Sequence, residues 1–239
     1  MKARIAGILW LIVIGAGLWS FIVLATLIVR NDPAATAANI LASEQSYRLA
    51  FVASLIAGAC YMGVTAILYD LLKPVNRTLS LLAAFFGVAG VAAGAAASVV
   101  QFIPLVLLGP ARYATGFTAT ELEALAYVAL RVQTQGSNIG MVFFGLQCFS
   151  AGYLIFRSGF IPRILGVLLA LGGLSYITAS FATFVAPELA ARLAYGAALG
   201  LLGEGSFTVW LIVTGANRAT RGESAARSAG ASMPRTTLA

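Results

Sequence analysis

The feature that most constrains this chain is a succession of six apolar stretches, each about long enough to cross a lipid bilayer. A hydrocarbon core of ~30 Å requires about 20 helical residues at ~1.5 Å per residue. The stretches lie near residues 5–29, 48–72, 78–104, 136–156, 163–185 and 191–214. They are apolar on every side, whereas the strands of a membrane barrel alternate apolar and polar residues. The sequence therefore predicts an all-α polytopic membrane protein, a bundle of six transmembrane helices.

The composition leaves little room for a soluble domain. Of the 239 residues, 60% are hydrophobic and 10% are charged, whereas soluble domains have roughly 45–50% apolar and about 25% charged residues. Residues 1–217 are predicted to form a single six-helix transmembrane domain. Residues 218–239 are rich in Ala, Ser, Thr and Arg and lack apolar periodicity, so we expect a disordered basic cytoplasmic tail.

The positions of Lys and Arg predict the orientation, because cytoplasmic loops carry an excess of them. With the N-terminus inside, ten cationic residues fall on the inner side: Lys2, Arg4, Lys73, Arg77, Arg157, Arg163, Arg218, Arg221, Arg227 and Arg235. Five fall outside: Arg30, Arg48, Arg112, Arg131 and Arg192. Both termini are therefore expected in the cytoplasm, and this charge placement favours a bacterial cytoplasmic (inner) membrane. The scattered basic residues report topology, so no nucleic-acid partner is expected.

The first apolar stretch resembles a secretory signal but is too long for one. It follows Lys2 and Arg4 and runs for about twice the ~7–15 residues of a signal peptide. We therefore expect a retained first helix.

The connections contain helix start and stop signals. Asn76 is suited to cap the third span, and Gly159 is suited to end the fourth in a left-handed conformation before Pro162 starts the fifth. On the outer side, Asp32-Pro33 predicts a short surface helix through about Gln45. Residues 121–135 are expected to extend the fourth helix beyond the membrane.

Glu204 is the strongest candidate for a functional residue. It lies near the middle of the sixth span, where a charge is unfavourable by about 2.5–3.5 kcal/mol on insertion scales. Gly200 and Gly196 precede it by one and two turns on the same face and permit close approach of a neighbouring helix. Glu204 is therefore either a neutral residue bonding a neighbouring helix or part of an ion, proton or ligand site.

The fourth span supplies a second set of polar groups. Gln135, Asn138 and Gly145 fall on one side of the helix, and Gly136, Gly140 and Gln147 fall nearly opposite, so both sides are expected to contact protein. Amides in spans commonly form modest interhelical hydrogen bonds. Gln101, just before Pro104, is expected at the headgroup boundary.

The remaining chemistry is sparse. The chain has no His, and Cys60 and Cys148 lie in separate spans, so no metal site, disulfide or cofactor is expected. One intramembrane carboxylate without a second catalytic group makes an enzyme unlikely to be the function. Asp70 lies one turn before Lys73, which predicts an interfacial ion pair.

Four segments together resemble a known family. They are Arg4-Ile5-Ala6-Gly7, Leu72-Lys73-Pro74-Val75-Asn76-Arg77, the block from Gly152 through Arg157-Ser158-Gly159-Phe160-Ile161-Pro162-Arg163 to Gly166, and Gly203-Glu204 followed by Trp210. They resemble the bacterial membrane family catalogued as domain of unknown function 4386, over about residues 3–217. The resemblance implies about six transmembrane helices and no assigned reaction or substrate. It also implies His in many members at the position of Gln147.

Two hypotheses for function follow. The first is binding or transport of a small molecule or ion through a mid-membrane polar site formed by Glu204 with Asn138 or Gln147, joined by Gln135. The second is a non-catalytic interaction or assembly protein that recognises a membrane-protein partner or membrane lipid. The cations Lys73, Arg77, Arg157 and Arg163 are interpreted as inner-boundary charges.

Overall fold

The computed structural model describes residues 2–109, 116–186, 188–189 and 198–214. Within those residues every regular element is a helix. The helices are α1 (Lys2–Leu27), α2 (Pro33–Ala42), α3 (Glu44–Leu72), α4 (Arg77–Leu108), α5 (Ala119–Ser158), α6 (Arg163–Val185) and a last helix, Ala198–Thr214. Five of these described helices, α1, α3, α4, α5 and α6, are long and apolar enough to cross a membrane. The structure thus confirms an all-helical chain with the character of a multipass membrane protein.

Two predicted segments fall wholly or partly outside the described residues. The sixth span, predicted near 191–214, is described only from Ala198 onward. The predicted tail, residues 218–239, lies entirely outside the described part of the chain.

The helix boundaries follow local sequence signals. The Asn76 side chain accepts a hydrogen bond from the Leu79 backbone N–H at 2.9 Å, which caps α4. Asp32 caps α2 in the same way by accepting from the Ala35 N–H at 2.9 Å. Gly159 ends α5 with φ of 68°, a left-handed conformation that glycine adopts without steric cost. These three signals were recognisable in the sequence and are confirmed.

Two boundaries differ from the predicted spans. α4 continues through Pro104 to Leu108, four residues beyond the span predicted near 78–104. Proline is tolerated inside transmembrane helices because neighbouring groups satisfy the backbone around it, and Pro104 is buried within the bundle. α5 extends from Ala119 to Ser158, 40 residues, which confirms the predicted extension ahead of residue 136.

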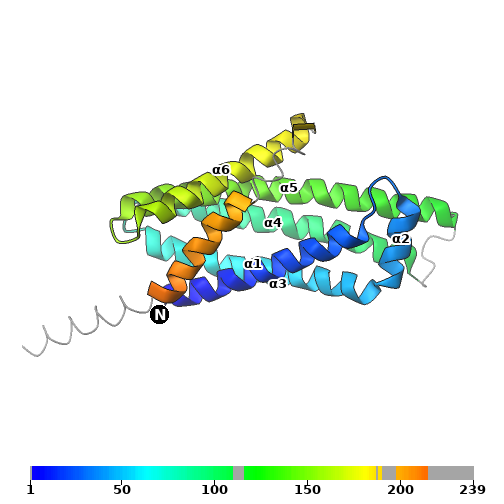
Figure 1. Cartoon of the computed structure of the whole chain (residues 1–239), viewed down its shortest axis with the longest axis horizontal. Helices are drawn as coiled ribbons and strands as arrows, with labels where there is room; N and C mark the ends of the chain where they lie inside the picture. Colours follow the sequence, from blue (N-terminus) through cyan, green and yellow to red (C-terminus); the bar gives the residue numbers. More distant parts are fainter. Residues whose placement is uncertain (1, 110–115, 187, 190–197, 215–239) are drawn as a thin grey trace, which may run out of the picture.

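The helices form an elongated bundle in which antiparallel neighbours pack along their lengths (Figure 1). α1 packs on α3, while α4 and α6 pack on α5. The short α2 lies at the end of the bundle opposite the N-terminus and also contacts α5. The last helix runs from α6 to the start of α1, so residue 214 lies near the N-terminus of the described chain.

α5 and α6 approach closely because glycines face each other along their contact. A Cβ atom added to Gly152 would lie 2.6 Å from the backbone N of Ala170, and one added to Gly145 would lie 2.6 Å from the carbonyl O of Gly173. On the opposite side of α5, a Cβ at Gly136 would lie 3.0 Å from the Cβ of Ala97 on α4. Both sides of α5 therefore contact protein, as its sequence predicts.

The outside of the bundle carries large apolar side chains. Phe21, Phe85 and Val99 are 69%, 61% and 70% exposed, and many similar residues are exposed along the long helices. Soluble proteins rarely expose contiguous apolar surface on this scale, whereas lipid tails provide a matching environment. The apolar exterior and the long apolar helices together fit a membrane protein.

Candidate functional site

Glu204 lies among hydrogen-bond donors from several helices. The indole N–H of Trp10 on α1 donates to Oε2 of Glu204 at 3.1 Å. The thiol of Cys148 on α5 donates to Oε1 at 3.8 Å, a long contact typical of sulfur. Tyr176 on α6 is a further hydrogen-bonding neighbour of the same carboxyl. The carboxyl of the last helix is thus contacted by three other helices.

Local packing explains how these groups meet. Gly200 lies one turn before Glu204, and its missing side chain leaves the space that the Tyr176 ring occupies. Gly203 lies against the backbone of α6 near Leu168, with a hypothetical Cβ only 2.6 Å from the Leu168 carbonyl O. These small residues therefore allow the last helix to pack close to α6, which places the Glu204 carboxyl among aromatic side chains.

The groups around this carboxyl are mostly aromatic. The Trp10 ring packs edge-on against Phe207 at 5.7 Å and against Tyr61 at 6.2 Å between ring centroids. Trp10 is 1% exposed and Phe207 is fully buried, while Glu204 itself is half-buried. We call Glu204, Trp10, Tyr61, Cys148 and Tyr176 the carboxyl cluster. Its surroundings exclude most water and strengthen the electrostatic interactions of the carboxyl.

The carboxyl cluster contains neutral donors and no fixed positive charge. The ion pairs found among the described residues join Lys2 and Lys73 to Asp70, and Arg48 to Glu44. Glu204 takes part in none of them. If Glu204 were ionised, no cationic side chain among the described residues would neutralise its charge. A proton or another cation would then have to do so.

The titratable groups of the carboxyl cluster are one carboxyl, one thiol and two phenols. No group of three or more His, Cys, Asp or Glu side chains suited to hold a metal occurs in the described ranges. The carboxyl cluster has one carboxyl and no paired general base among its described members. What it offers chemically is reversible protonation and hydrogen-bond acceptance.

Gln147 has a different set of partners. Its amide Nε2 donates to the hydroxyl of Thr65 on α3 at 3.1 Å, and the side chain is 3% exposed. The amide lies against Gly87 of α4, while its Oε1 has no hydrogen-bond partner. Gln147 and Cys148 are adjacent in α5 but point about 100° apart around the helix, so only Cys148 reaches Glu204. Gln147 therefore links α5 to α3.

The other predicted amides lie at separate positions along the bundle. Gln135 is half-buried, and its buried Oε1 has no hydrogen-bond partner. Asn138, also half-buried, lies one turn further along α5. Gln101 is 1% exposed and its backbone carbonyl accepts the Tyr47 hydroxyl at 2.5 Å, so it lies inside the bundle instead of at an exposed boundary. The structure gives Glu204 the partners Trp10 and Cys148, not these amides.

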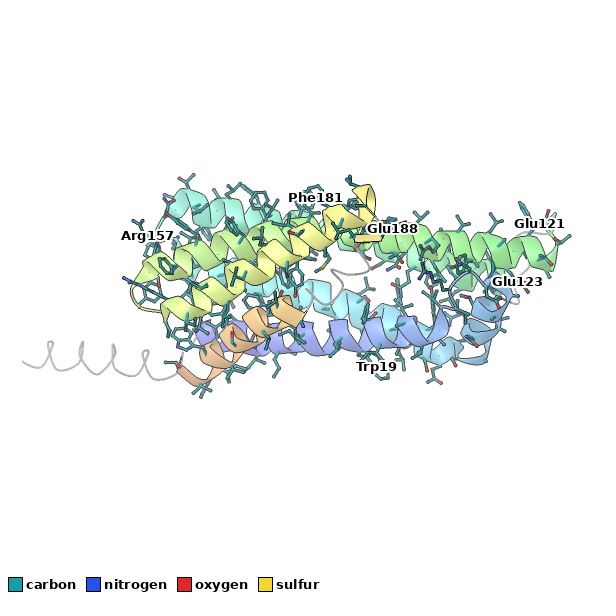
Figure 2. All side chains as sticks on the ribbon, turned by 45° about the horizontal axis from the view of Figure 1, so that its top comes forward. Trp19, Glu121, Glu123, Arg157, Phe181 and Glu188 are labelled. Carbon is teal, nitrogen blue, oxygen red and sulfur yellow. The ribbon has the colours of Figure 1, made fainter. Side chains whose placement is uncertain are left out.

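The predicted inner-boundary cations lie together at one end of the bundle. Lys73, just after α3, pairs with Asp70 at 2.7 Å, which confirms the predicted ion pair, and Lys2 binds the same carboxylate at 2.8 Å. Arg77 begins α4, and Arg163 begins α6 with its guanidinium 5.6 Å from the Phe156 ring centroid. Figure 2 shows Arg157 at this end and Glu121 and Glu123 at the opposite end.

The sequence contained weak signals for the other members of the carboxyl cluster. Trp10 follows Lys2 by two helical turns and so lies deeper than a headgroup-level tryptophan. A cysteine inside an apolar span, such as Cys148, is typical of a small packing group. Tyr176 and Tyr61 had no signal that distinguished them from ordinary core aromatics.

The chain is 25% identical over 155 residues to an uncharacterized protein of Archaeoglobus fulgidus, an alignment that covers 64% of this chain and 75% of that protein. No solved structure matches the chain. The family described as "Domain of unknown function (DUF4386)" matches residues 5–215. The match spans most of the chain and includes Trp10, Cys148, Tyr176 and Glu204, so this protein belongs to that family.

Proposed function

We propose that this protein binds or transports a small molecule or ion, with Glu204 as the group that carries a proton or contacts a cationic ligand. The observation behind the proposal is the carboxyl cluster, in which Glu204 faces Trp10 and Cys148 and has no cationic partner among the described residues. A carboxyl held this way is most stable when a proton or cation neutralises it.

The geometry supports a Glu204 carboxyl that can change between a neutralised and an ionised state. Neutral donors stabilise the ionised carboxylate without fixing it, whereas an Arg or Lys would hold it ionised permanently. Glu204 as a residue is half-buried, whereas Phe207 one turn away is fully buried. Proton carriers and cation sites in membranes use such isolated carboxyls.

We further propose six spans with both termini in the cytoplasm of a bacterial inner membrane. The support is the common end of the bundle that holds Lys2, Lys73, Arg77, Arg157 and Arg163, whereas Glu121 and Glu123 lie at the other end. Positive charge of this kind accumulates on the cytoplasmic side. In this orientation the carboxyl cluster lies about two helical turns above the inner boundary, measured from Lys2 to Trp10.

Thermal stability of the detergent-purified protein tests the proposal. Wild type, Glu204→Gln and Glu44→Gln would be screened against a library of ions, amines and metabolites. Glu44→Gln is the matched control, because it makes the same change on an exposed side chain that pairs with Arg48. A compound that stabilises wild type and Glu44→Gln but not Glu204→Gln supports the proposed site. Flux of that compound into proteoliposomes then separates transport from binding.

A non-catalytic assembly role is the second proposal, and α1 carries the observation that favours it. Gly15 and Gly17 have nothing within 4 Å of a hypothetical Cβ, so a partner helix has space to approach the backbone there. No small-molecule stabilisation of any variant, together with wild-type stability of Glu204→Gln, would favour this role over binding or transport.

A further inference from the structure

A pocket of about 450 Å³ opens at the cationic end of the bundle, away from the carboxyl cluster. Residues 74–76, which connect α3 to α4, form one side of it, and the end of α5 forms the other with Tyr153, Arg157, Ser158 and Phe160. This volume lies within the range of small-molecule sites in proteins.

Arg157 gives this pocket an uncompensated positive charge. Among the described residues, the acidic side chain at this end is Asp70, which already binds both Lys2 at 2.8 Å and Lys73 at 2.7 Å. No ion pair of Arg157 occurs among the described residues. A planar guanidinium presents several donors in a geometry that matches the oxygens of a phosphate group. The pocket therefore favours an anionic ligand.

The other lining groups favour a ligand that is polar at one end and apolar at the other. Tyr153 lies one turn before Arg157 on the same face of α5 and is 49% exposed on the apolar exterior. The amide of Asn76 uses its oxygen to cap α4 through the Leu79 N–H, which leaves its NH₂ group available to a ligand. Arg157 and Asn76 thus supply donors, while Tyr153 and Phe160 supply apolar surface beside them.

The pocket also lies where a lipid headgroup would be. α5 ends at Ser158 and α6 begins at Arg163, so the turn between them lies at the edge of the apolar bundle. Figure 2 shows Arg157 at the extreme end of the long helices. Basic pockets between transmembrane helices at this level recognise lipid phosphates.

We propose that this pocket binds the phosphate of an anionic phospholipid headgroup, with Arg157 as its principal contact and the acyl chains lying along Tyr153. The shared chemistry is a phosphate group, which a soluble phosphate also carries. Tyr153 and Phe160, which add apolar surface beside Arg157, favour the lipid as the source. This site is independent of Glu204, so failure of one proposal leaves the other unaffected.

Native mass spectrometry and thermal stability of the full chain test the lipid site. The protein would be titrated with phosphatidylglycerol, with phosphatidylcholine and with inorganic phosphate, as wild type, Arg157→Gln and Arg163→Gln. Arg163→Gln removes an equal charge from the same end of the bundle, but Arg163 does not line the pocket and lies over Phe156 instead. Arg157 is exposed, so its replacement should leave the fold intact.

We expect wild type to prefer phosphatidylglycerol over phosphatidylcholine. Arg157→Gln should weaken phosphatidylglycerol binding about fivefold, the factor that ~1 kcal/mol per basic residue at a membrane surface implies, and Arg163→Gln should retain most of it. Equal losses in the two variants would indicate diffuse charge attraction and overturn the proposal. An equal response to inorganic phosphate would assign the pocket to a soluble anion, and no preference between the two lipids would also overturn it.

If Arg157→Gln proves unstable in detergent, Arg157→Lys provides the second test. Lysine keeps the charge but lacks the planar donor pair. A phosphate contact predicts that Arg157→Lys binds phosphatidylglycerol more weakly than wild type does. Unchanged binding with Lys would show that net charge alone attracts the lipid and would contradict a specific phosphate contact.

Discussion

The indole N–H of Trp10 donates a hydrogen bond to the carboxyl of Glu204 across 194 residues of sequence, at 3.1 Å. The bond joins the first described helix to the last, and these two helices also meet at Gly7, where a Cβ would lie 2.7 Å from Cγ1 of Ile212. One polar contact inside an apolar bundle therefore connects α1 to the last helix. Within the described ranges, that last helix carries the carboxyl that lies deepest in an apolar stretch.

Replacing Trp10 with Phe should destabilise the protein by about 1–3 kcal/mol, because the change removes a hydrogen-bond donor and shrinks a ring packed on Phe207 and Tyr61. The measurement is the free energy of unfolding in mixed detergent micelles. Trp19→Phe on the same helix is the control. Trp19 is 50% exposed, so its replacement should change stability by less than about 0.5 kcal/mol.

A double-mutant cycle of Trp10→Phe with Glu204→Met isolates the hydrogen bond from the packing. The coupling energy should lie near 0.5–1.5 kcal/mol, the range of interhelical hydrogen bonds in membranes. A coupling energy of zero would show that Trp10 contributes through packing alone.

Gly152→Ala should destabilise the protein by about 1–3 kcal/mol, because the added methyl group meets the α6 backbone at Ala170 and Gly166 and forces the two helices apart. Gly15→Ala on α1 is the matched control, since nothing lies within 4 Å of its hypothetical Cβ. It should be neutral or slightly stabilising, because alanine favours the helix. Equal losses for the two variants would contradict close packing of α5 on α6.

Gln147→Met should change the free energy of unfolding by less than about 1 kcal/mol. It removes one amide contact to Thr65, which averages ~0.6 kcal/mol in membranes, and it also removes a buried Oε1 that has no partner. Thr65→Val should have a similar small effect. A loss above about 2 kcal/mol in either variant would reveal that this amide bonds more strongly than a single contact to Thr65 allows.

Reporter fusions test the proposed topology. An alkaline phosphatase fused after Arg157 or after Arg218 should be inactive, and a green fluorescent protein at the same positions should fluoresce, because both positions are predicted to be cytoplasmic. Phosphatase activity after Arg218 with an inactive fusion after Arg157 would show an odd number of spans between them. Activity at both positions would invert the whole orientation.

Much of this architecture was predictable from local sequence. The caps at Asp32 and Asn76 and the left-handed Gly159 each depend on a few neighbouring residues, so their helix boundaries followed directly. The Asp70–Lys73 pair lies within one helical turn and was equally predictable. Pro104 shows the limit of local signals, because a proline inside a helix is tolerated only where neighbouring groups satisfy the backbone around it.

The sequence by itself determined that the chain is built from long apolar helices, because a bilayer requires each spanning segment to satisfy its own backbone hydrogen bonds over a fixed length. It also identified Glu204 as an unfavourable charge in an apolar stretch. Only the tertiary structure decided that Trp10 and Cys148 contact this carboxyl while Gln147 turns to Thr65. The helices are apolar on all sides, so periodicity does not specify which face meets which neighbour. Close glycine contacts, such as Gly203 against Leu168 and Gly7 against Ile212, set the rotation and crossing of the helices and thereby choose the partners of Glu204.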